Sequence, residues 1–177
     1  MNILILTGSP RPNGNSSTLA ERFAEGAKAA GHTVTRLDAA HLDIHPCVAC
    51  EHCHNGSGTC VFHDGFAEIR RAIAKADALV FAAPVYYFGL PAQLTAAIDR
   101  FYACGDDLDI PKKAALIVTL ADTDPDTAAA AVLQFRKTAE YVGWADGGVL
   151  VATGLGAAGE AKGSPFAEQA YALGKNF

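Results

Sequence analysis

Hydrophobic residues follow two different patterns along this chain, and the two patterns alternate. Continuous apolar runs are typical of strands that are buried on both faces of a parallel sheet. They predict strands over residues 2–7, 78–83, 114–120 and 148–153. A fifth segment, residues 32–38, alternates apolar and polar side chains, so we expect a strand near an edge of the sheet.

Between the strands, apolar residues recur at helical spacing. In the first such segment, Leu19, Phe23 and Ala27 fall on one face of a helix. The same spacing predicts helices over residues 16–30, 66–75, 90–102, 125–142 and 165–173. Residues 39–65 show no helical or strand period, so we expect a long loop there.

Alternation of apolar strands with helices indicates a parallel sheet covered by helices on both faces. The sequence therefore predicts an α/β fold, a flavodoxin-like doubly wound five-stranded parallel sheet in the order 2-1-3-4-5. We expect a single domain over residues 1–177, with a Cys-rich loop, residues 39–65, after strand 2. A ligand of such a fold binds beyond the carboxyl ends of the strands, where strands 1 and 3 diverge.

Charge and hydropathy exclude several classes of partner. The formal net charge is −5, and the basic residues are scattered, so we expect no nucleic-acid partner. No segment reaches the roughly 18 uninterrupted apolar residues of a spanning helix, so we expect no membrane contact. Residues 1–6 lack the cationic start of a secretory signal, and the chain is therefore predicted to be cytoplasmic.

The turn after the first strand, TGSPRPNGNSST, is dense in hydroxyl and amide side chains and opens directly into a helix. The amides and the dipole at a helix start favour an anion, and the hydroxyls with one Arg would complete a phosphate site. The turn has neither the Lys-Ser/Thr of a P-loop nor a Gly-x-Gly-x-x-Gly motif, which disfavours Mg-ATP and a dinucleotide. The plain alternative is an ordinary turn with a Ser cap.

The turn after the third strand, APVYYFGLP, carries three consecutive aromatic residues beside Gly and Pro. This composition favours a rigid platform against which a flat heterocycle can lie. Alternatively, the rings close the core or form a dimer face. Because the two turns follow neighbouring strands, a phosphate site and an aromatic slot would lie together, and flavin mononucleotide (FMN) fits that pair.

These motifs resemble those of the NADPH-dependent FMN reductase-like flavoproteins. The segment GSPRPNGNSS is similar to their FMN phosphate loop, and APVYYFGLPAQL with the following IDR is similar to their isoalloxazine loop and helix. The segment PCVACEHC, followed by GTCV and Asp64, resembles the cysteine segment of the iron–sulfur flavoprotein branch. The resemblance covers residues 1 to about 120, and beyond these only the order of strands and helices supports it.

The resemblance implies non-covalent FMN, reduction by NAD(P)H or a ferredoxin-type donor, and a homo-oligomer, either a dimer or a tetramer. It assigns the phosphate to Ser9, Arg11, Asn15, Ser16 and Ser17. It assigns the flavin ring to Pro84, Val85, Tyr86, Tyr87, Phe88 and Gly89. Thr119, after the fourth strand, is a further contact in the family, although the loop that follows it here lacks the family's glycines.

Four of the five cysteines lie within one short segment, with the spacing Cys47-x2-Cys50-x2-Cys53-x6-Cys60. Four Cys thiolates are the usual ligands of a [4Fe–4S] cluster, and this spacing lets one loop wrap one cluster. Zinc is an alternative, because it binds sulfur and imidazole and four histidines lie nearby. A third alternative is an empty loop with free or oxidised thiols. We expect Cys104 to be a small buried side chain.

Two redox functions and one non-redox function follow from these motifs. The first is an FMN-dependent oxidoreductase that passes electrons from NAD(P)H to a small acceptor such as a flavin or a quinone. The second is an iron–sulfur flavoprotein that relays electrons between a protein donor and FMN. The third is a zinc-stabilised binding module, which would leave the phosphate and aromatic turns without a role.

Overall fold

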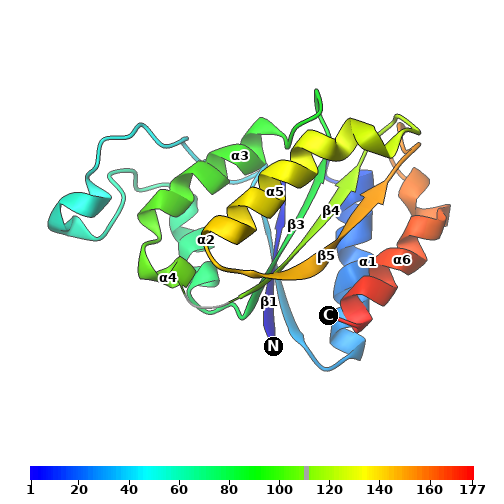
Figure 1. The fold of residues 1–177 in the computed structure, drawn as a ribbon, viewed down its shortest axis with the longest axis horizontal. Coiled ribbons are helices and arrows are strands. Elements are labelled where there is room, and N and C mark those ends of the chain that lie inside the picture. Colours follow the sequence, from blue (N-terminus) through cyan, green and yellow to red (C-terminus); the bar gives the residue numbers. More distant parts are fainter. Residues whose placement is uncertain (110–111) are drawn as a thin grey trace.

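The computed structural model describes residues 1–109 and 112–177. Its centre is a five-stranded sheet in the order β2-β1-β3-β4-β5, and every neighbouring pair of strands is parallel (Figure 1). The strands are β1 (Asn2–Thr7), β2 (Thr33–Asp38), β3 (Ala78–Pro84), β4 (Lys113–Thr119) and β5 (Ala145–Ala152). The predicted fold class and strand order are confirmed, and the alternating segment is an edge strand.

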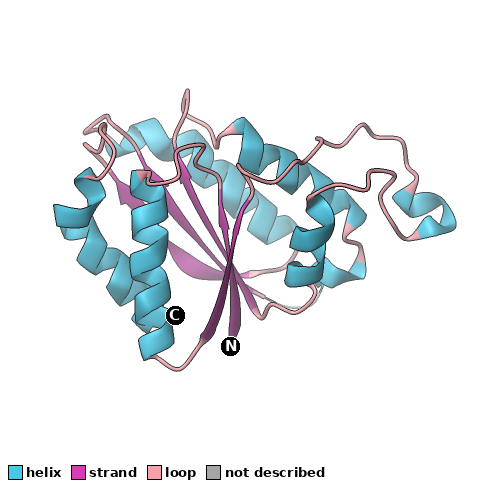
Figure 2. Ribbon diagram, turned by 180° about the vertical axis from the view of Figure 1, so that it is seen from behind, coloured by secondary structure: helices cyan, strands magenta, loops and turns pink. Residues whose placement is uncertain are grey.

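Helices cover both faces of the sheet, as Figures 1 and 2 show from opposite sides. One face carries α1 (Asn15–Ala29) and α6 (Pro165–Lys175). The other carries α2 (Phe66–Ile73), α3 (Ala92–Asp99), α5 (Ala129–Tyr141) and the short α4 (Asp106–Asp109). Four single turns complete the structure, at Cys53–Ser57, Arg100–Ala103, Pro125–Ala128 and Glu160–Gly163.

The continuous apolar runs bury both faces of the central strands. In β1, Ile3 and Ile5 belong to the core under α1 and α6, whereas Leu4 and Leu6 belong to the core under α2, α3 and α5. All four side chains are at most 1% exposed. Burial of each stabilises the fold by about 1.5–3 kcal/mol, so β1 fixes the two layers of helices relative to each other.

Two glycines let α1 and α6 touch backbone to backbone. A Cβ added at Gly26 would lie 2.0 Å from the Tyr171 carbonyl oxygen, and one at Gly174 would lie 2.0 Å from the Phe23 carbonyl oxygen. Any larger residue would force the helices apart. This close contact fixes α1, whose amino end faces the carboxyl edge of the sheet.

Most predicted elements differ from the structure by one to three residues at their ends. The predicted helix over 90–102 begins at Ala92, because Pro91 is its N-cap, and it changes to a 3-10 turn at Arg100. Strand β5 begins at Ala145, earlier than its apolar run, and its pairing with β4 is irregular between Ala114 and Leu116. Gly147 and Gly148 give that part of the strand no apolar signal.

The Cys-rich loop follows β2, as predicted, and projects away from the sheet (Figures 1 and 2). Within the described ranges, 1–109 and 112–177, no helix is both long and apolar enough to cross a membrane.

Candidate functional site

A cleft of about 240 Å³ opens at the carboxyl edge of the sheet, between the loops that follow β1, β3, β4 and β5. It brings together residues that are far apart in the sequence. Its lining is Ser9, Arg11, Gly14, Asn15, Ser16, Pro84, Val85, Tyr86, Thr119, Leu120, Ala121, Leu155 and Gly156. The cleft therefore joins most of the residues assigned to the phosphate and to the flavin ring, including Thr119.

The amino end of α1 forms the polar wall of this cleft. Its N-cap is Gly14, which provides no side chain to the first amides, and the first turn carries no acidic residue. The Ser16 hydroxyl is buried, and its Oγ has no hydrogen-bond partner in the protein. A buried hydroxyl without a partner is costly, so this arrangement favours an external acceptor such as a phosphate oxygen.

The loop before α1 is folded tightly against itself. The Ser9 Oγ lies 3.2 Å from both the backbone nitrogen and the carbonyl oxygen of Arg11. A Cβ at Gly14 would lie 2.6 Å from the same Oγ and 3.2 Å from the Arg11 carbonyl oxygen, so a larger residue there would displace the Ser9 hydroxyl. The Arg11 side chain is exposed and makes one long hydrogen bond, 3.5 Å, to the Gly156 carbonyl oxygen, which leaves its guanidinium available to an anion.

Asn15 uses its side chain to hold the loop after β5. Its Nδ2 donates to the carbonyl oxygens of Leu155 (3.2 Å) and Ala157 (2.8 Å), and its Oδ1 accepts from the Ala161 amide (3.0 Å). The side-chain amide predicted to bind phosphate is thus occupied within the protein. The loop that it holds places Leu155 and Gly156 in the cleft, two residues that the sequence analysis missed.

The aromatic loop divides into a part that lines the cleft and a part that projects from it. The Val85 amide donates to the Thr119 carbonyl oxygen at 2.8 Å, which joins the loops after β3 and β4. Tyr86 and Gly89 exchange two backbone hydrogen bonds, of 3.0 and 3.1 Å, around a two-residue turn. Tyr87 and Phe88 form the tip of that turn and have positive φ angles of 46° and 68°.

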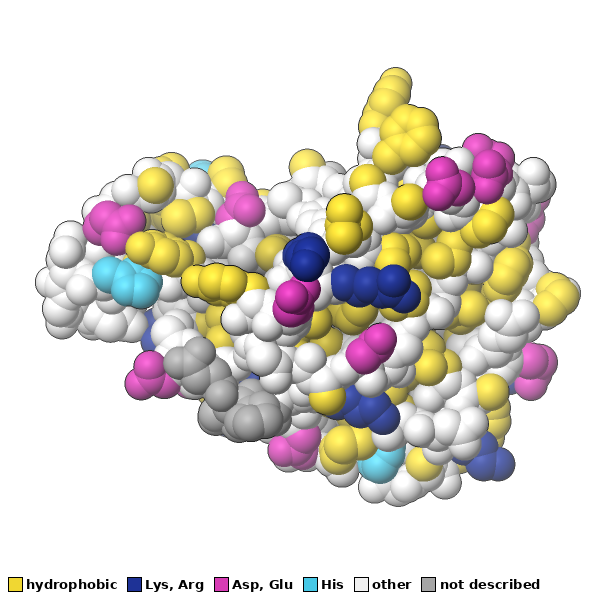
Figure 3. Space-filling view, viewed as in Figure 1, with side chains coloured by type: hydrophobic (Ala, Val, Ile, Leu, Met, Phe, Trp, Pro, Cys, Tyr) yellow, Lys and Arg dark blue, Asp and Glu magenta, His cyan; other side chains and the backbone are white. Residues whose placement is uncertain are grey.

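This tip points into solvent: the loop between β3 and α3 projects from the molecule in Figure 1, and hydrophobic side chains project at the same place in Figure 3. Tyr87 is 100% exposed and Phe88 is 60% exposed. These two rings do not close the core of this chain, and neither they nor Gly89 line the cleft. Ser17 is buried in the first turn of α1 and does not line the cleft either.

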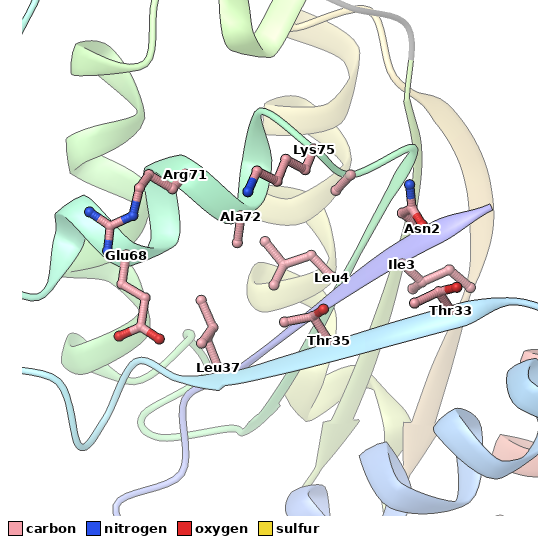
Figure 4. A pocket seen from close by; sticks show the side chains of 11 residues that line it. Asn2, Ile3, Leu4, Thr33, Thr35, Leu37, Glu68, Arg71, Ala72 and Lys75 are labelled. Carbon is pink, nitrogen blue, oxygen red and sulfur yellow. The ribbon is translucent and has the colours of Figure 1, made fainter.

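A wider groove, of about 500 Å³, lies between α2 and strands β1 and β2 (Figure 4). The groove runs along the edge of the sheet, where β2 is the last strand. Its polar rim includes Glu68 and Arg71 from α2, Lys75 just after that helix, and Thr33 and Thr35 from the edge strand. The predicted flavin and metal residues lie elsewhere.

The four clustered cysteines line one small cavity, which we call the four-cysteine cavity. Cys47, Cys50, Cys53 and Cys60 share it with Arg100. The remaining lining is Val48, Glu51, Val61, Phe62, Tyr102 and Ala103. Cys47 and Cys50 are exposed, whereas Cys53 and Cys60 are partly buried. The predicted ligand set is thus gathered around one space.

Polar contacts hold this loop against the end of α3. Asp64 accepts hydrogen bonds from the Arg100 guanidinium (2.9 Å), the His45 amide (3.0 Å) and the Phe66 amide (3.1 Å). Burial alone would raise the pKa of Asp64, but these donors outweigh it and hold the pKa below its ordinary value. Arg70 adds a hydrogen bond of 2.8 Å to the Gly58 carbonyl oxygen.

The loop does not by itself form a closed metal site. In the described part of the chain, no three His, Cys, Asp or Glu side chains are arranged to hold one metal ion. His54 is occupied, since its Nε2 lies 2.9 Å from the Tyr102 carbonyl oxygen and its ring packs on Tyr102 at 4.2 Å. Burial raises the pKa of the Cys53 thiol, and the other three thiols add to that shift.

The fifth cysteine is separate from this group. Cys104 is 1% exposed, and burial raises the pKa of its thiol to about 12. A thiol with so high a pKa is protonated at neutral pH and is a poor nucleophile and metal ligand. The prediction of a small buried side chain is confirmed.

Comparison with known proteins finds relatives of two kinds. An iron–sulfur flavoprotein of Methanocaldococcus jannaschii is 31% identical over 100 residues, which are 56% of this chain and 51% of that protein. A Bacillus subtilis protein named as an NAD(P)H-dependent FMN-containing oxidoreductase is 25% identical over 167 residues, 87% of this chain and 86% of that protein. The chain spans about half the length of the iron–sulfur flavoproteins that it matches.

Solved structures share the fold. The NAD(P)H:quinone oxidoreductase from Methanothermobacter marburgensis superposes with a TM-score of 0.79 at 23% identity, covering 99% of this chain and 95% of that one. The family model for NADPH-dependent FMN reductase matches residues 1–154. This range contains the cleft loops after β1, β3 and β4, and it ends just before Leu155 and Gly156 in the loop after β5. The chain therefore belongs to the NADPH-dependent FMN reductase family.

Proposed function

We propose that this chain is an FMN-dependent oxidoreductase that takes electrons from NAD(P)H and passes them to a small acceptor such as a flavin or a quinone. One observation carries the proposal. The buried Ser16 hydroxyl has no partner in the protein, and it lies at the uncapped amino end of α1 in the same cleft as Pro84, Val85 and Tyr86.

The residues present fit FMN at both ends. Ser16, the first amides of α1 and the exposed guanidinium of Arg11 suit a phosphate, because they combine a helix dipole with free donors. The loops after β3 and β4 are joined backbone to backbone and present Tyr86 and Thr119 to the same space, which suits the edge of a planar ring. Asn15 acts indirectly, by holding the loop after β5.

FMN, when bound, supplies the hydride and electron chemistry, so the protein needs only to bind, orient and shield it. The cleft contains no paired acid and base, and its lining offers one charged side chain, Arg11. This agrees with a site whose work is positioning. We further propose that the active form is a homo-oligomer, because the exposed Tyr87 and Phe88 beside the cleft suit contact with a second copy.

The test is to purify the protein without oxygen and add NADH or NADPH. We expect about one FMN per chain and loss of the flavin colour on addition of reduced nicotinamide, with recovery on addition of a quinone. Protein that binds no flavin, or flavin that reduced nicotinamide does not bleach, would contradict the proposal.

A second candidate function is favoured by the four-cysteine cavity. We propose that Cys47, Cys50, Cys53 and Cys60 hold a [4Fe–4S] cluster and that the chain relays electrons between a redox protein and FMN. Four thiols around one space match the donor set of a cubane cluster. The cavity and the cleft share no lining residue, so electrons would pass between two separate sites.

A further inference from the structure

The four-cysteine cavity contains a charged side chain that the proposed function does not explain. Arg100 is 1% exposed, and arginine is almost never fully buried unless it is paired, as Arg100 is with Asp64. Its Nε has no hydrogen-bond partner. Among the buried side-chain nitrogen and oxygen atoms of the described residues, only this nitrogen and the Ser16 Oγ are unpartnered. Each belongs to a residue that lines a candidate ligand site.

The rest of the Arg100 guanidinium is fixed in place. Its Nη1 donates to the His45 carbonyl oxygen (2.8 Å) and to Asp64 (2.9 Å), and its Nη2 donates to Asp64 (3.4 Å). The rings of Phe62 and Phe66 lie on the guanidinium, with centroids 5.2 and 4.8 Å from Cζ. The side chain therefore cannot turn away to satisfy its Nε elsewhere.

The charge of Arg100 is balanced from one side only. Asp64 is its ion-pair partner, but Asp64 does not line the four-cysteine cavity. The cavity thus meets the positive member of a buried ion pair, in surroundings where charge is weakly screened. Four thiolates bring negative charge to the same space, and an iron–sulfur cluster becomes more negative when it is reduced.

From this geometry we propose that Arg100 sets the reduction potential of the cluster. Its fixed cation favours the reduced form, and its free Nε–H is available to a sulfur atom. Net charge and hydrogen bonds to sulfur are the main determinants of such potentials. This inference rests on the cluster proposed above, and it assigns to Arg100 a role apart from holding the loop.

The experiment is a redox titration of the cluster-loaded protein, followed by visible absorbance and electron paramagnetic resonance, in which the cluster takes one electron from a mediator. In the double variant Asp64→Asn/Arg100→Gln, an amide pair replaces the ion pair and no buried charge is left alone. We expect its potential to fall by at least 59 mV, a tenfold change in the one-electron equilibrium. Arg100→Lys keeps the charge and should stay closer to the wild-type potential.

Arg70→Gln is the matched control, because Arg70 also holds the loop, through Gly58, but does not line the cavity. It should keep both the iron and the potential. Equal shifts in the double variant and in Arg70→Gln, or no shift in either, would overturn the inference. Loss of iron from the double variant alone would also overturn it, by showing that Arg100 only shapes the loop. Wild-type protein that takes up no iron would instead overturn the cluster itself.

Discussion

The flavin cleft and the four-cysteine cavity are both built from loops that leave the carboxyl edge of the sheet, yet they are held in different ways. In the cleft, backbone groups of neighbouring strand ends bond to each other, as Val85 and Thr119 do, and the buried Asn15 holds the loop after β5. In the cavity, a long loop is held by a few side chains, chiefly the Asp64–Arg100 ion pair, and two of its cysteines are exposed.

The difference implies that the fold alone forms the flavin cleft, whereas the four-cysteine cavity needs its ligand to become fully ordered. The cleft inherits its geometry from the buried sheet, so it should keep its shape without FMN. The Cys-rich loop has few buried apolar contacts, which is typical of segments that open at low free-energy cost. A bound cluster would therefore contribute much of the order of that loop.

The largest expected effect is the loss of iron from Cys53→Ser. Removing one of four thiolate ligands should abolish the iron and sulfide content, while FMN stays bound because the cleft shares no residue with the cavity. Iron, sulfide and flavin analysis of anaerobically prepared protein measures this. Cys104→Ser, at the buried fifth cysteine, is the control and should change neither content.

Loss of FMN together with iron in Cys53→Ser would show that the two sites depend on each other. The separation of cleft and cavity would then be wrong.

Asn15→Ala should destabilise the flavin cleft and leave the Cys-rich loop unchanged. It removes three hydrogen bonds and leaves buried backbone groups of the loop after β5 without partners, which costs about 3 kcal/mol of unfolding free energy. Urea unfolding of the apoprotein measures the cost, and the affinity for FMN should fall with it. Asn13→Ala, an exposed residue of the same turn, is the control and should stay within about 0.5 kcal/mol of wild type. Equal stabilities of the two variants would remove Asn15 from its proposed role.

Acid should weaken the Asp64 contacts that hold the Cys-rich loop. The pKa of Asp64 is lowered in the folded protein, so its contribution to stability is present above its unfolded value of about 3.9 and is lost as the pH falls through the lower folded value. The difference in unfolding free energy between wild type and Asp64→Asn should be largest near neutral pH and shrink below about pH 4. A difference that does not change between pH 7 and pH 3 would contradict this account.

The smallest expected effect concerns the exposed tip of the aromatic loop. Tyr87 and Phe88 have positive φ angles, which favour Asn and Gly in a two-residue turn. The variant Tyr87→Asn/Phe88→Gly should therefore keep or raise the unfolding free energy, by up to about 1 kcal/mol. If the tip contacts a second copy, the same variant should dissociate the oligomer in sedimentation experiments. A variant that is clearly less stable as a monomer would show that the rings support the fold.

The apolar runs were sufficient to predict the strand order and the edge of the sheet where ligands bind, because burial on both faces leaves a strong signal in the sequence. Contacts between distant loops leave no such signal in the sequence. Nothing local reveals that the Asn15 side chain reaches Leu155, or that Arg100 bonds to Asp64 across the Cys-rich loop. Composition also predicted an aromatic platform without showing that Tyr86 lines the cleft while Tyr87 points into solvent. Gly154 and Gly156, after the last strand, were the available signal for the missed wall of the cleft.

Calorimetric titration of the apoprotein with FMN and with riboflavin, in wild type and in Ser16→Ala, tests most directly the claim that the amino end of α1 binds the phosphate of a flavin. We expect one FMN per chain, with Ser16→Ala weakening FMN by about 1.5–3 kcal/mol, roughly 10- to 150-fold. The same variant should leave the weaker binding of riboflavin unchanged, because riboflavin has no phosphate, and should not destabilise the apoprotein, where the buried hydroxyl has no partner. Equal affinities for FMN and riboflavin in wild type, or an equal loss of both in Ser16→Ala, would contradict the account.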